Sequence, residues 1–146
     1  YRVLKAREYS VWNKMITSNE EIRIKDEVTQ AYKVYLRNFE AGDMKAIEAS
    51  CSFPLSFDSD GEVKSFTQFP IDVTAMKETT GYHRSLNSDI EVIAVSKTKA
   101  HIILRKALRV KQDGTPIESV SGFYIWIKVD GAWKMKFASA ITLKQG

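Results

Sequence analysis

A lysine in the middle of an apolar row is the first residue whose position suggests chemistry. Lys106 interrupts a row of alternating apolar residues, Ile102, Leu104, Leu108 and Val110. A lysine that points from such a row into an apolar interior has a lowered pKa and can act as a base or as a substrate anchor. A β-bulge at Lys106 and Ala107 is the alternative, because it would turn the charge outward.

A histidine is the second candidate. His83 lies two residues after Gly81, where a helix is predicted to end. Imidazole changes charge near neutral pH, so His83 is a candidate for proton transfer, with a plain surface or capping histidine as the alternative. His101 is the only other histidine, Cys51 is the only cysteine, and no acidic cluster accompanies them. We therefore predict no metal site, no disulfide and no cofactor.

The composition is typical of one globular domain. A chain of 146 residues can bury a self-sufficient core. The 22 basic and 18 acidic residues give a net charge of +4, but they are interspersed, without the basic and aromatic clusters that bind single strands. No apolar run approaches the roughly 20 residues of a membrane span. We predict a cytoplasmic protein that binds neither nucleic acid nor membranes.

Helical periodicity dominates the first part of the chain. Apolar residues over 3–16 suggest a first helix with imperfect spacing. Ser18 and Glu21 have the spacing of a capping box, which predicts that a second helix begins near Asn19. One face of this helix is apolar for three turns and consists of Val28, Ala31, Tyr32, Tyr35, Leu36 and Phe39.

Turn and capping residues divide the segments that follow. Gly42 suits a left-handed helix end, and Asp43 can cap a short helix that runs towards Cys51. Alternating residues over 53–57 and 63–69, separated by the turn sequence DSDG, predict a hairpin. Residues 70–80 are predicted as a further helix, with proline in its first turn.

Period-two alternation continues to the end of the chain. The predicted strands are residues 90–96, 100–111, 117–129 and 133–143, separated by turn signals. We predict an α+β fold in which a curved antiparallel sheet wraps over three N-terminal helices and forms a cone around one apolar pocket. The predicted organisation is an N-terminal helical extension, residues 1–18, followed by a single domain, residues 19–146.

Two short segments make the pattern similar to a known family. Residues 39–47, FEAGDMKAI, match its helix-to-helix corner, and residues 130–134, DGAWK, match its last hairpin. With the element order over 19–143, the chain resembles the nuclear transport factor 2-like superfamily, also described as cystatin-like cones, in its ketosteroid isomerase-like and polyketide cyclase-like branch. The superfamily contains isomerases, dehydratases, hydrolases and proteins that only bind ligands or dimerise, so the resemblance alone does not assign an activity.

The resemblance implies two catalytic positions. Tyr35 stands where the ketosteroid isomerases have a tyrosine that donates to the oxyanion, although it also belongs to the apolar helix face and can simply pack there. Asp58 matches their general base after a one-residue deletion, although an aspartate that opens a turn commonly bonds its own backbone. The acid that forms their second oxyanion donor is missing from 122–127, GFYIWI, which disfavours steroid isomerisation.

The resemblance also implies a pocket and a dimer. Apolar candidates for substrate contact, beside Lys106, are Phe53, Met76, Phe123 and Phe137. On the strand 117–129, the row of Phe123, Ile125, Ile127 and Val129 is predicted to face the core, which places Tyr124 and Trp126 on the opposite face. With Arg105 and Arg109 on the neighbouring strand, these aromatics have the composition of an interface, and the family commonly dimerises sheet against sheet.

These observations predict a homodimeric cone that binds a small, largely apolar molecule. Tyr35, Asp58 and His83 would catalyse a lyase, isomerase or hydrolase reaction. The alternative is a non-catalytic binding or dimerisation module.

Overall fold

The chain folds into a six-stranded sheet packed against one long helix. The computed structural model describes residues 15–143, so most of the helix predicted over 3–16 lies outside the described residues. Met15 and Ile16 are described and are not helical. The elements are α2 (Ser18–Ala41), α3 (Met44–Ala49), β1 (Cys51–Ser59), β2 (Glu62–Phe66), α4 (Val73–Thr80), β3 (Arg84–Val95), β4 (Lys99–Val110), β5 (Pro116–Val129) and β6 (Ala132–Leu143).

Helix α2 begins one residue before its predicted start. The capping box consists of Thr17 and Glu20, whose side chains accept from each other's backbone N–H at 3.1 Å, instead of Ser18 and Glu21. The buried face is the predicted stripe extended by one turn, and consists of Ile24, Val28, Tyr32, Tyr35 and Phe39. The helix ends at Gly42, which has a φ of 70° that favours glycine.

The cap can be tested directly. Replacing Thr17 with alanine is expected to lower the free energy of unfolding by about 1 kcal/mol, because helical N–H groups lose their acceptor. The matched change Ser18→Ala is expected to cost less than about 0.5 kcal/mol. Urea denaturation of both variants checks this, and a larger loss for Ser18→Ala would contradict the observed cap.

The two shorter helices are capped by aspartates. Asp43 accepts from the N–H of Ala46 at 3.1 Å and starts α3, as predicted. Asp72 accepts from the N–H of Ala75 at 3.0 Å, so α4 begins at Val73 and not at Pro70. Lys77 on α4 donates to the carbonyl oxygen of Glu40 at 2.6 Å and ties α4 to the end of α2.

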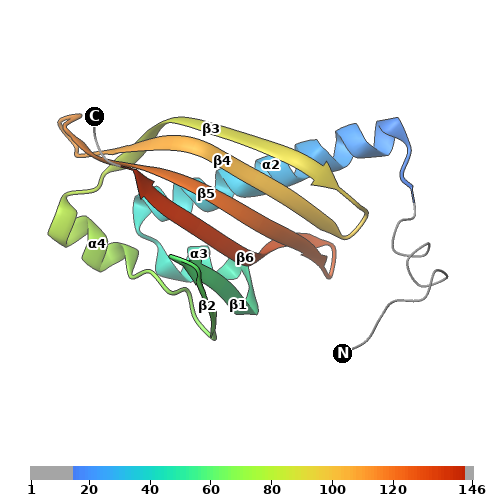
Figure 1. Cartoon of the computed structure of the whole chain (residues 1–146), viewed down its shortest axis with the longest axis horizontal. Helices are drawn as coiled ribbons and strands as arrows, with labels where there is room; N and C mark the ends of the chain where they lie inside the picture. The colour runs from blue at the N-terminus through green and yellow to red at the C-terminus, as the bar shows by residue number, and fades with distance from the viewer. Residues whose placement is uncertain (1–14, 144–146) are drawn as a thin grey trace.

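The sheet is mixed and not purely antiparallel as predicted. Its order is β2-β1-β6-β5-β4-β3, and β1 pairs with β6 in parallel while every other pair is antiparallel. The four long strands β3–β6 form the predicted meander, with β3 starting earlier, at Arg84. In Figure 1 the strands lie in front and α2 runs behind them, so the helix covers one face of the curved sheet.

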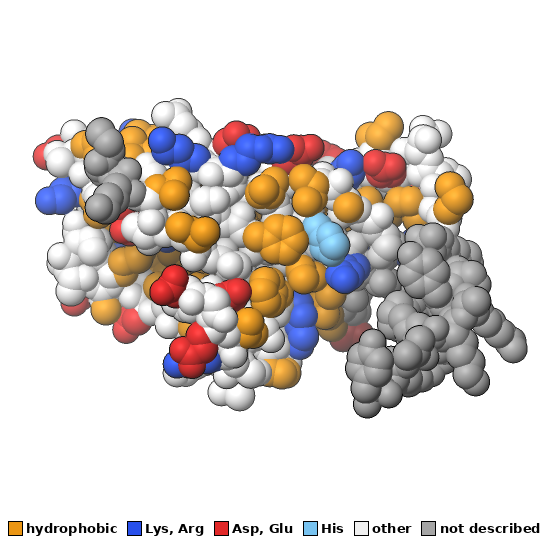
Figure 2. Space-filling model, viewed as in Figure 1, with side chains coloured by type: hydrophobic (Ala, Val, Ile, Leu, Met, Phe, Trp, Pro, Cys, Tyr) orange, Lys and Arg blue, Asp and Glu red, His pale blue; other side chains and the backbone are white. Residues whose placement is uncertain are grey.

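The face of β5 that meets the core is the opposite of the predicted one. Trp126 is fully buried against α2, and Tyr124 is packed against the core, whereas Phe123 and Ile125 lie on the outer face. The prediction failed because both faces of β5 are apolar, so alternation alone does not tell which one the helix covers. Pairing places Ile103 beside Phe123, and Ile125 beside Phe137. Figure 2 shows that hydrophobic side chains gather in the middle of this outer face, beside a histidine.

Candidate ligand cavity

A cavity of about 60 Å³ lies between α2 and the inner face of the sheet. This volume holds a few water-sized groups. Its wall is mainly apolar, and the apolar side chains are Leu36, Phe39, Phe57, Phe69, Ile71, Leu104, Ala107, Val120, Met135, Ala138 and Ala140. The polar side chains of the wall are Tyr32, Tyr35, Tyr124, Ser85, Ser88, Ser139 and Arg109.

Three tyrosines from two elements meet in this cavity. The ring of Tyr32 lies 5.7 Å from that of Tyr35 and 5.5 Å from that of Tyr124. Burial is the main cause that raises the pKa of all three, well above the ordinary value of 10.0 for Tyr32 and Tyr35. The neighbouring Tyr124 and Tyr35 raise the pKa of Tyr32 further. At neutral pH the phenols are therefore uncharged hydrogen-bond donors.

A glycine lets Tyr124 lie close to its own strand. A Cβ at Gly122 would stand 2.8 Å from the hydroxyl oxygen of Tyr124 and 3.0 Å from its Cζ. The absence of this atom allows the ring to lie over the backbone of β5, with its hydroxyl at the cavity. A side chain at Gly122 would displace that hydroxyl.

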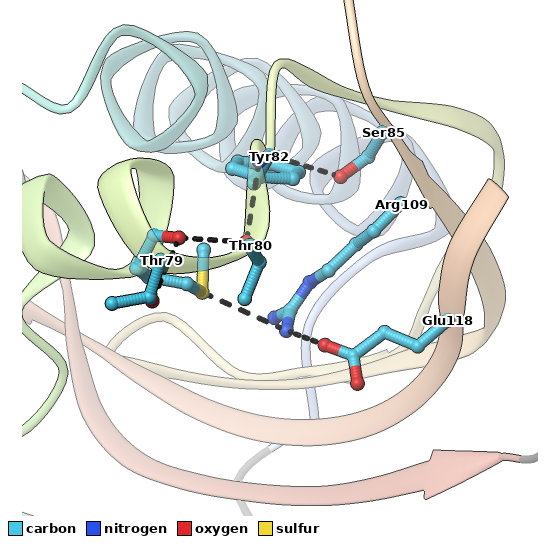
Figure 3. Close-up of polar contacts among 7 residues, drawn as sticks. Thr79, Thr80, Tyr82, Ser85, Arg109 and Glu118 are labelled. Atoms are coloured by element: carbon cyan, nitrogen blue, oxygen red, sulfur yellow. Dashed lines mark hydrogen bonds and ion pairs between the residues drawn. The ribbon is translucent and has the colours of Figure 1, made fainter. Parts of the chain in front are cut away.

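Arg109 brings a full positive charge to the cavity wall. Its Nη1 atom lies 2.9 Å from Oε1 of Glu118 and 3.9 Å from Sδ of Met76 (Figure 3). The guanidinium carbon lies 5.7 Å from the ring centroid of Phe39 and 5.8 Å from that of Tyr82. These aromatic faces attract the cation, and they hold a side chain that is only 18% exposed.

Further polar contacts lie near Arg109, around Ser85 in the cavity wall. Figure 3 shows Tyr82 beside Ser85, with 2.8 Å between their oxygen atoms. Glu40 accepts from the N–H of Ser85 at 2.8 Å and anchors the start of β3 to α2. Burial is the largest cause that raises the pKa of Tyr82, to about 12.

The tyrosine pKa values predict a loss of stability at high pH. Tyr32, Tyr35, Tyr82 and Tyr124 all have pKa values above that of an unfolded tyrosine, so the folded state retains their protons longer. Below about pH 10, these tyrosines should not change the free energy of unfolding. Above about pH 10, the free energy of unfolding should fall by up to about 1.4 kcal/mol per pH unit for each tyrosine. Urea denaturation from neutral to alkaline pH, with tyrosinate absorbance followed in parallel, measures this. Stability that stays constant through alkaline pH would contradict the burial.

Of the predicted catalytic residues, only Tyr35 lines the cavity. Tyr35 is 6% exposed. Asp58 accepts from the N–H of Gly61 at 2.8 Å, so its carboxylate serves the turn and does not line the cavity. His83 is exposed, and its backbone N–H donates to Val110.

None of the predicted substrate-contact residues lines the cavity. A register shift between Leu104 and Ala107 turns Lys106 out to solvent, as the bulge alternative predicted. Phe123 lies on the outer face of β5. Phe137 lies beside Ile125 on the same outer face, because a register shift between β5 and β6 changes the face of β6 after Met135. Phe53 packs against the core and Met76 against Arg109, and neither lines the cavity.

The predicted interface is divided between the two faces. Arg105 is exposed and pairs with Asp89 at 3.5 Å and with Glu91. Tyr124 and Trp126 face the helix and are unavailable to a partner. A surface for a partner on the outer face would use the half-buried Phe123, Ile125 and Phe137 instead.

The cavity residues that sequence reasoning missed are Tyr32, Tyr124 and Arg109. Tyr32 was visible in the helix stripe beside Tyr35. Tyr124 and Arg109 had been assigned to the outer face, and the only local signal was Gly122, which lets a large ring fold back over its strand. The bulge before Ala107 changes the face of every later residue of β4, so Arg109 could not be placed by counting.

The described residues contain neither a metal-binding cluster nor a helix suited to span a membrane. Within 15–143, no group of three or more His, Cys, Asp or Glu side chains is arranged to hold a metal ion. Burial raises the pKa of the Cys51 thiol to about 12, so it stays protonated at neutral pH. None of the described helices combines the length and apolar character needed to cross a membrane.

Comparison with solved structures identifies the architecture. A protein of unknown function from Nostoc punctiforme with a cystatin-like fold superposes with a TM-score of 0.66 at 13% identity, over 90% of this chain and 97% of that chain. The chain has the nuclear transport factor 2-like, or cystatin-like, fold. This confirms the fold that the resemblance over residues 39–47 and 130–134 implied.

Other structures with this fold carry more specific names. A candidate dehydratase of the nuclear transport factor 2-like family from Streptomyces avermitilis has a TM-score of 0.61 at 12% identity, over 84% of this chain and 98% of that one. A candidate scytalone dehydratase from Novosphingobium aromaticivorans has a TM-score of 0.60 at 18% identity, over 84% of this chain and 86% of that chain. No protein-family model matches the sequence, and the comparison with curated proteins gave no significant match.

Proposed function

We propose that this nuclear transport factor 2-like chain binds a small, largely apolar molecule in the cavity between α2 and the sheet. The observation that carries the proposal is the composition of the wall, in which apolar side chains surround three phenols and one guanidinium. Binding sites for small molecules are commonly apolar with a few convergent polar groups that orient the ligand. The phenols and Arg109 are such groups.

The same wall favours binding over catalysis. Its titratable side chains, among the described residues, are Tyr32, Tyr35, Tyr124 and Arg109. A general base must lose its proton near the working pH, and burial raises the pKa values of these phenols instead of lowering them. A reaction would have to use Tyr35 as a neutral donor to a developing oxyanion.

A dehydratase activity is the second candidate. It is favoured by the two structural neighbours named as candidate dehydratases and by the position of Tyr35 in the cavity. Loss of water needs a group that removes a proton, and Asp58 and His83 do not line the cavity. If the chain is a lyase, a basic group of the substrate itself must accept the proton that the C–H loses.

We also propose a homodimer, formed through the outer face of the sheet. Ile103 and Phe123 are cross-strand neighbours there, and Ile125 and Phe137 continue the patch. Ile141, on the same sheet, is 64% exposed. Apolar residues gathered in this way are typical of surfaces that pair with another chain.

Native mass spectrometry of gently purified protein tests both proposals. The expected result is a mass of two chains plus a small organic molecule that is released on denaturation. A thermal-shift screen of small apolar compounds then identifies binders independently of what was retained. A bare protein that no apolar compound stabilises would contradict the binding function, whereas a monomer would contradict only the dimer.

A further inference from the structure

Arg109 has more hydrogen-bonding capacity than its neighbours use. A guanidinium carries five N–H donors, and the hydrogen bonds of Arg109 to Glu118 and Met76 both use Nη1. No hydrogen bond of Nη2 or Nε is found among residues 15–143. The side chain is nevertheless only 18% exposed and lines the cavity. Among the described residues, the side-chain N and O atoms that are buried without a partner are the indole nitrogens of Trp126 and Trp133, so the free donors of Arg109 reach water or the cavity, where a ligand group can accept from them.

The charge of Arg109 extends into the cavity. Its charge opposes the rise in pKa that burial causes in Tyr35 and Tyr124. Glu118 is 31% exposed, so water screens its carboxylate better than the cavity wall screens Arg109. Arg109 lines the cavity and Glu118 does not, so the wall presents a positive group at this end.

We propose that the ligand is an apolar carboxylic acid, bound with its carboxylate at Arg109 and its body along the apolar wall. This inference rests on the proposed binding function and specifies its ligand class. Guanidinium and carboxylate form paired charge-assisted hydrogen bonds, which are stronger than neutral ones. The Tyr35 hydroxyl offers a further neutral donor. The apolar wall, with Leu104, Val120 and Met135, would contact the ligand body.

The carboxylate of Glu118 would compete with the ligand's carboxylate for the guanidinium of Arg109. Glu118 already occupies one edge of the guanidinium at 2.9 Å. A bound acid would take the edge that faces the cavity and leave Glu118 in place, or would displace it towards solvent. In either case the removal of Glu118 should strengthen acid binding, by about 2- to 5-fold, the range for releasing a partly exposed ion pair.

The experiment compares acids with uncharged analogues of the same shape. Propanoate, butanoate and isobutyrate are each titrated calorimetrically against propanol, butanol and isobutanol, at neutral pH and low salt. In the wild-type protein, at least one acid is expected to bind about 10-fold or more tightly than its alcohol. In Arg109→Gln the preference should disappear, in Arg109→Lys part of it should remain, and in Glu118→Gln it should increase. Circular dichroism confirms that each variant is folded.

The outcomes separate the two proposals. Alcohols that bind as tightly as their acids would overturn the acid class while leaving the binding function intact. A preference that persists in Arg109→Gln would also overturn the inference, because the carboxylate would be held elsewhere. Binding by none of the acids and none of the alcohols would overturn the inference, and the thermal-shift screen would then decide the binding function separately.

Discussion

Replacing Trp126 with alanine is expected to lower the free energy of unfolding by about 3–5 kcal/mol, the range for removing a large core aromatic. Trp126 is 0% exposed, and its ring lies 6.3 Å from that of Tyr32 and 6.1 Å from that of Tyr35. The change would leave a hole where α2 meets the sheet. Urea denaturation at a fixed protein concentration measures the loss.

Two matched variants test the reason for this loss. Trp126→Phe keeps most of the ring and removes an indole N–H that has no partner among the described residues, so it should cost less than about 1.5 kcal/mol. Phe123→Ala removes an aromatic from the outer face of the same strand and should cost less than Trp126→Ala. A larger loss for Phe123→Ala would mean that Phe123, and not Trp126, faces the core, as predicted from the sequence. The observed core would then be wrong.

Filling the cavity should abolish ligand binding while the protein stays folded. Ala138 is 4% exposed, lines the cavity, and pairs across strands with Phe57 and Tyr124. In Ala138→Leu an isobutyl group replaces a methyl group beside a space of about 60 Å³. We expect affinity for any compound identified in the thermal-shift screen to fall by about 100-fold or more, which corresponds to about 2.7 kcal/mol.

The control for this variant is Ala132→Leu, at the exposed start of the same strand. It adds the same group outside the cavity, so affinity should remain within about 2-fold of the wild type. Overpacking at Ala138 costs up to about 3 kcal/mol, so the melting temperature of both variants must be checked. Unchanged affinity in a folded Ala138→Leu protein would show that the ligand binds elsewhere.

The sequence predicted most elements because local signals agreed. The stripe from Val28 to Phe39 has helical spacing, Gly42 occupies a left-handed position, and Asp43 caps the next helix, as the structure confirms. Turn signals separated the strands of the meander correctly. The family resemblance followed from the corner at 39–47, which the fold comparison supports.

The site was predicted poorly because it depends on non-local geometry. Whether Trp126 or Phe123 faces the helix is set by tertiary packing, since both rows of β5 are apolar. A single extra residue between Leu104 and Ala107 changes which later side chains face inward, and it moved Lys106 out while bringing Arg109 in. The parallel pairing of β1 with β6 joins residues far apart in the chain, for which the sequence carries no local signal.

Xenon binding tests the central claim most directly, because it does not require knowledge of the ligand. Apolar cavities of suitable size bind xenon, whereas a packed core does not. A crystal pressurised with xenon should show the atom among Leu36, Leu104 and Met135, and Ala138→Leu should exclude it. Crystals of the wild-type protein without xenon at this position, and with side chains that fill the space between α2 and the sheet, would contradict the account.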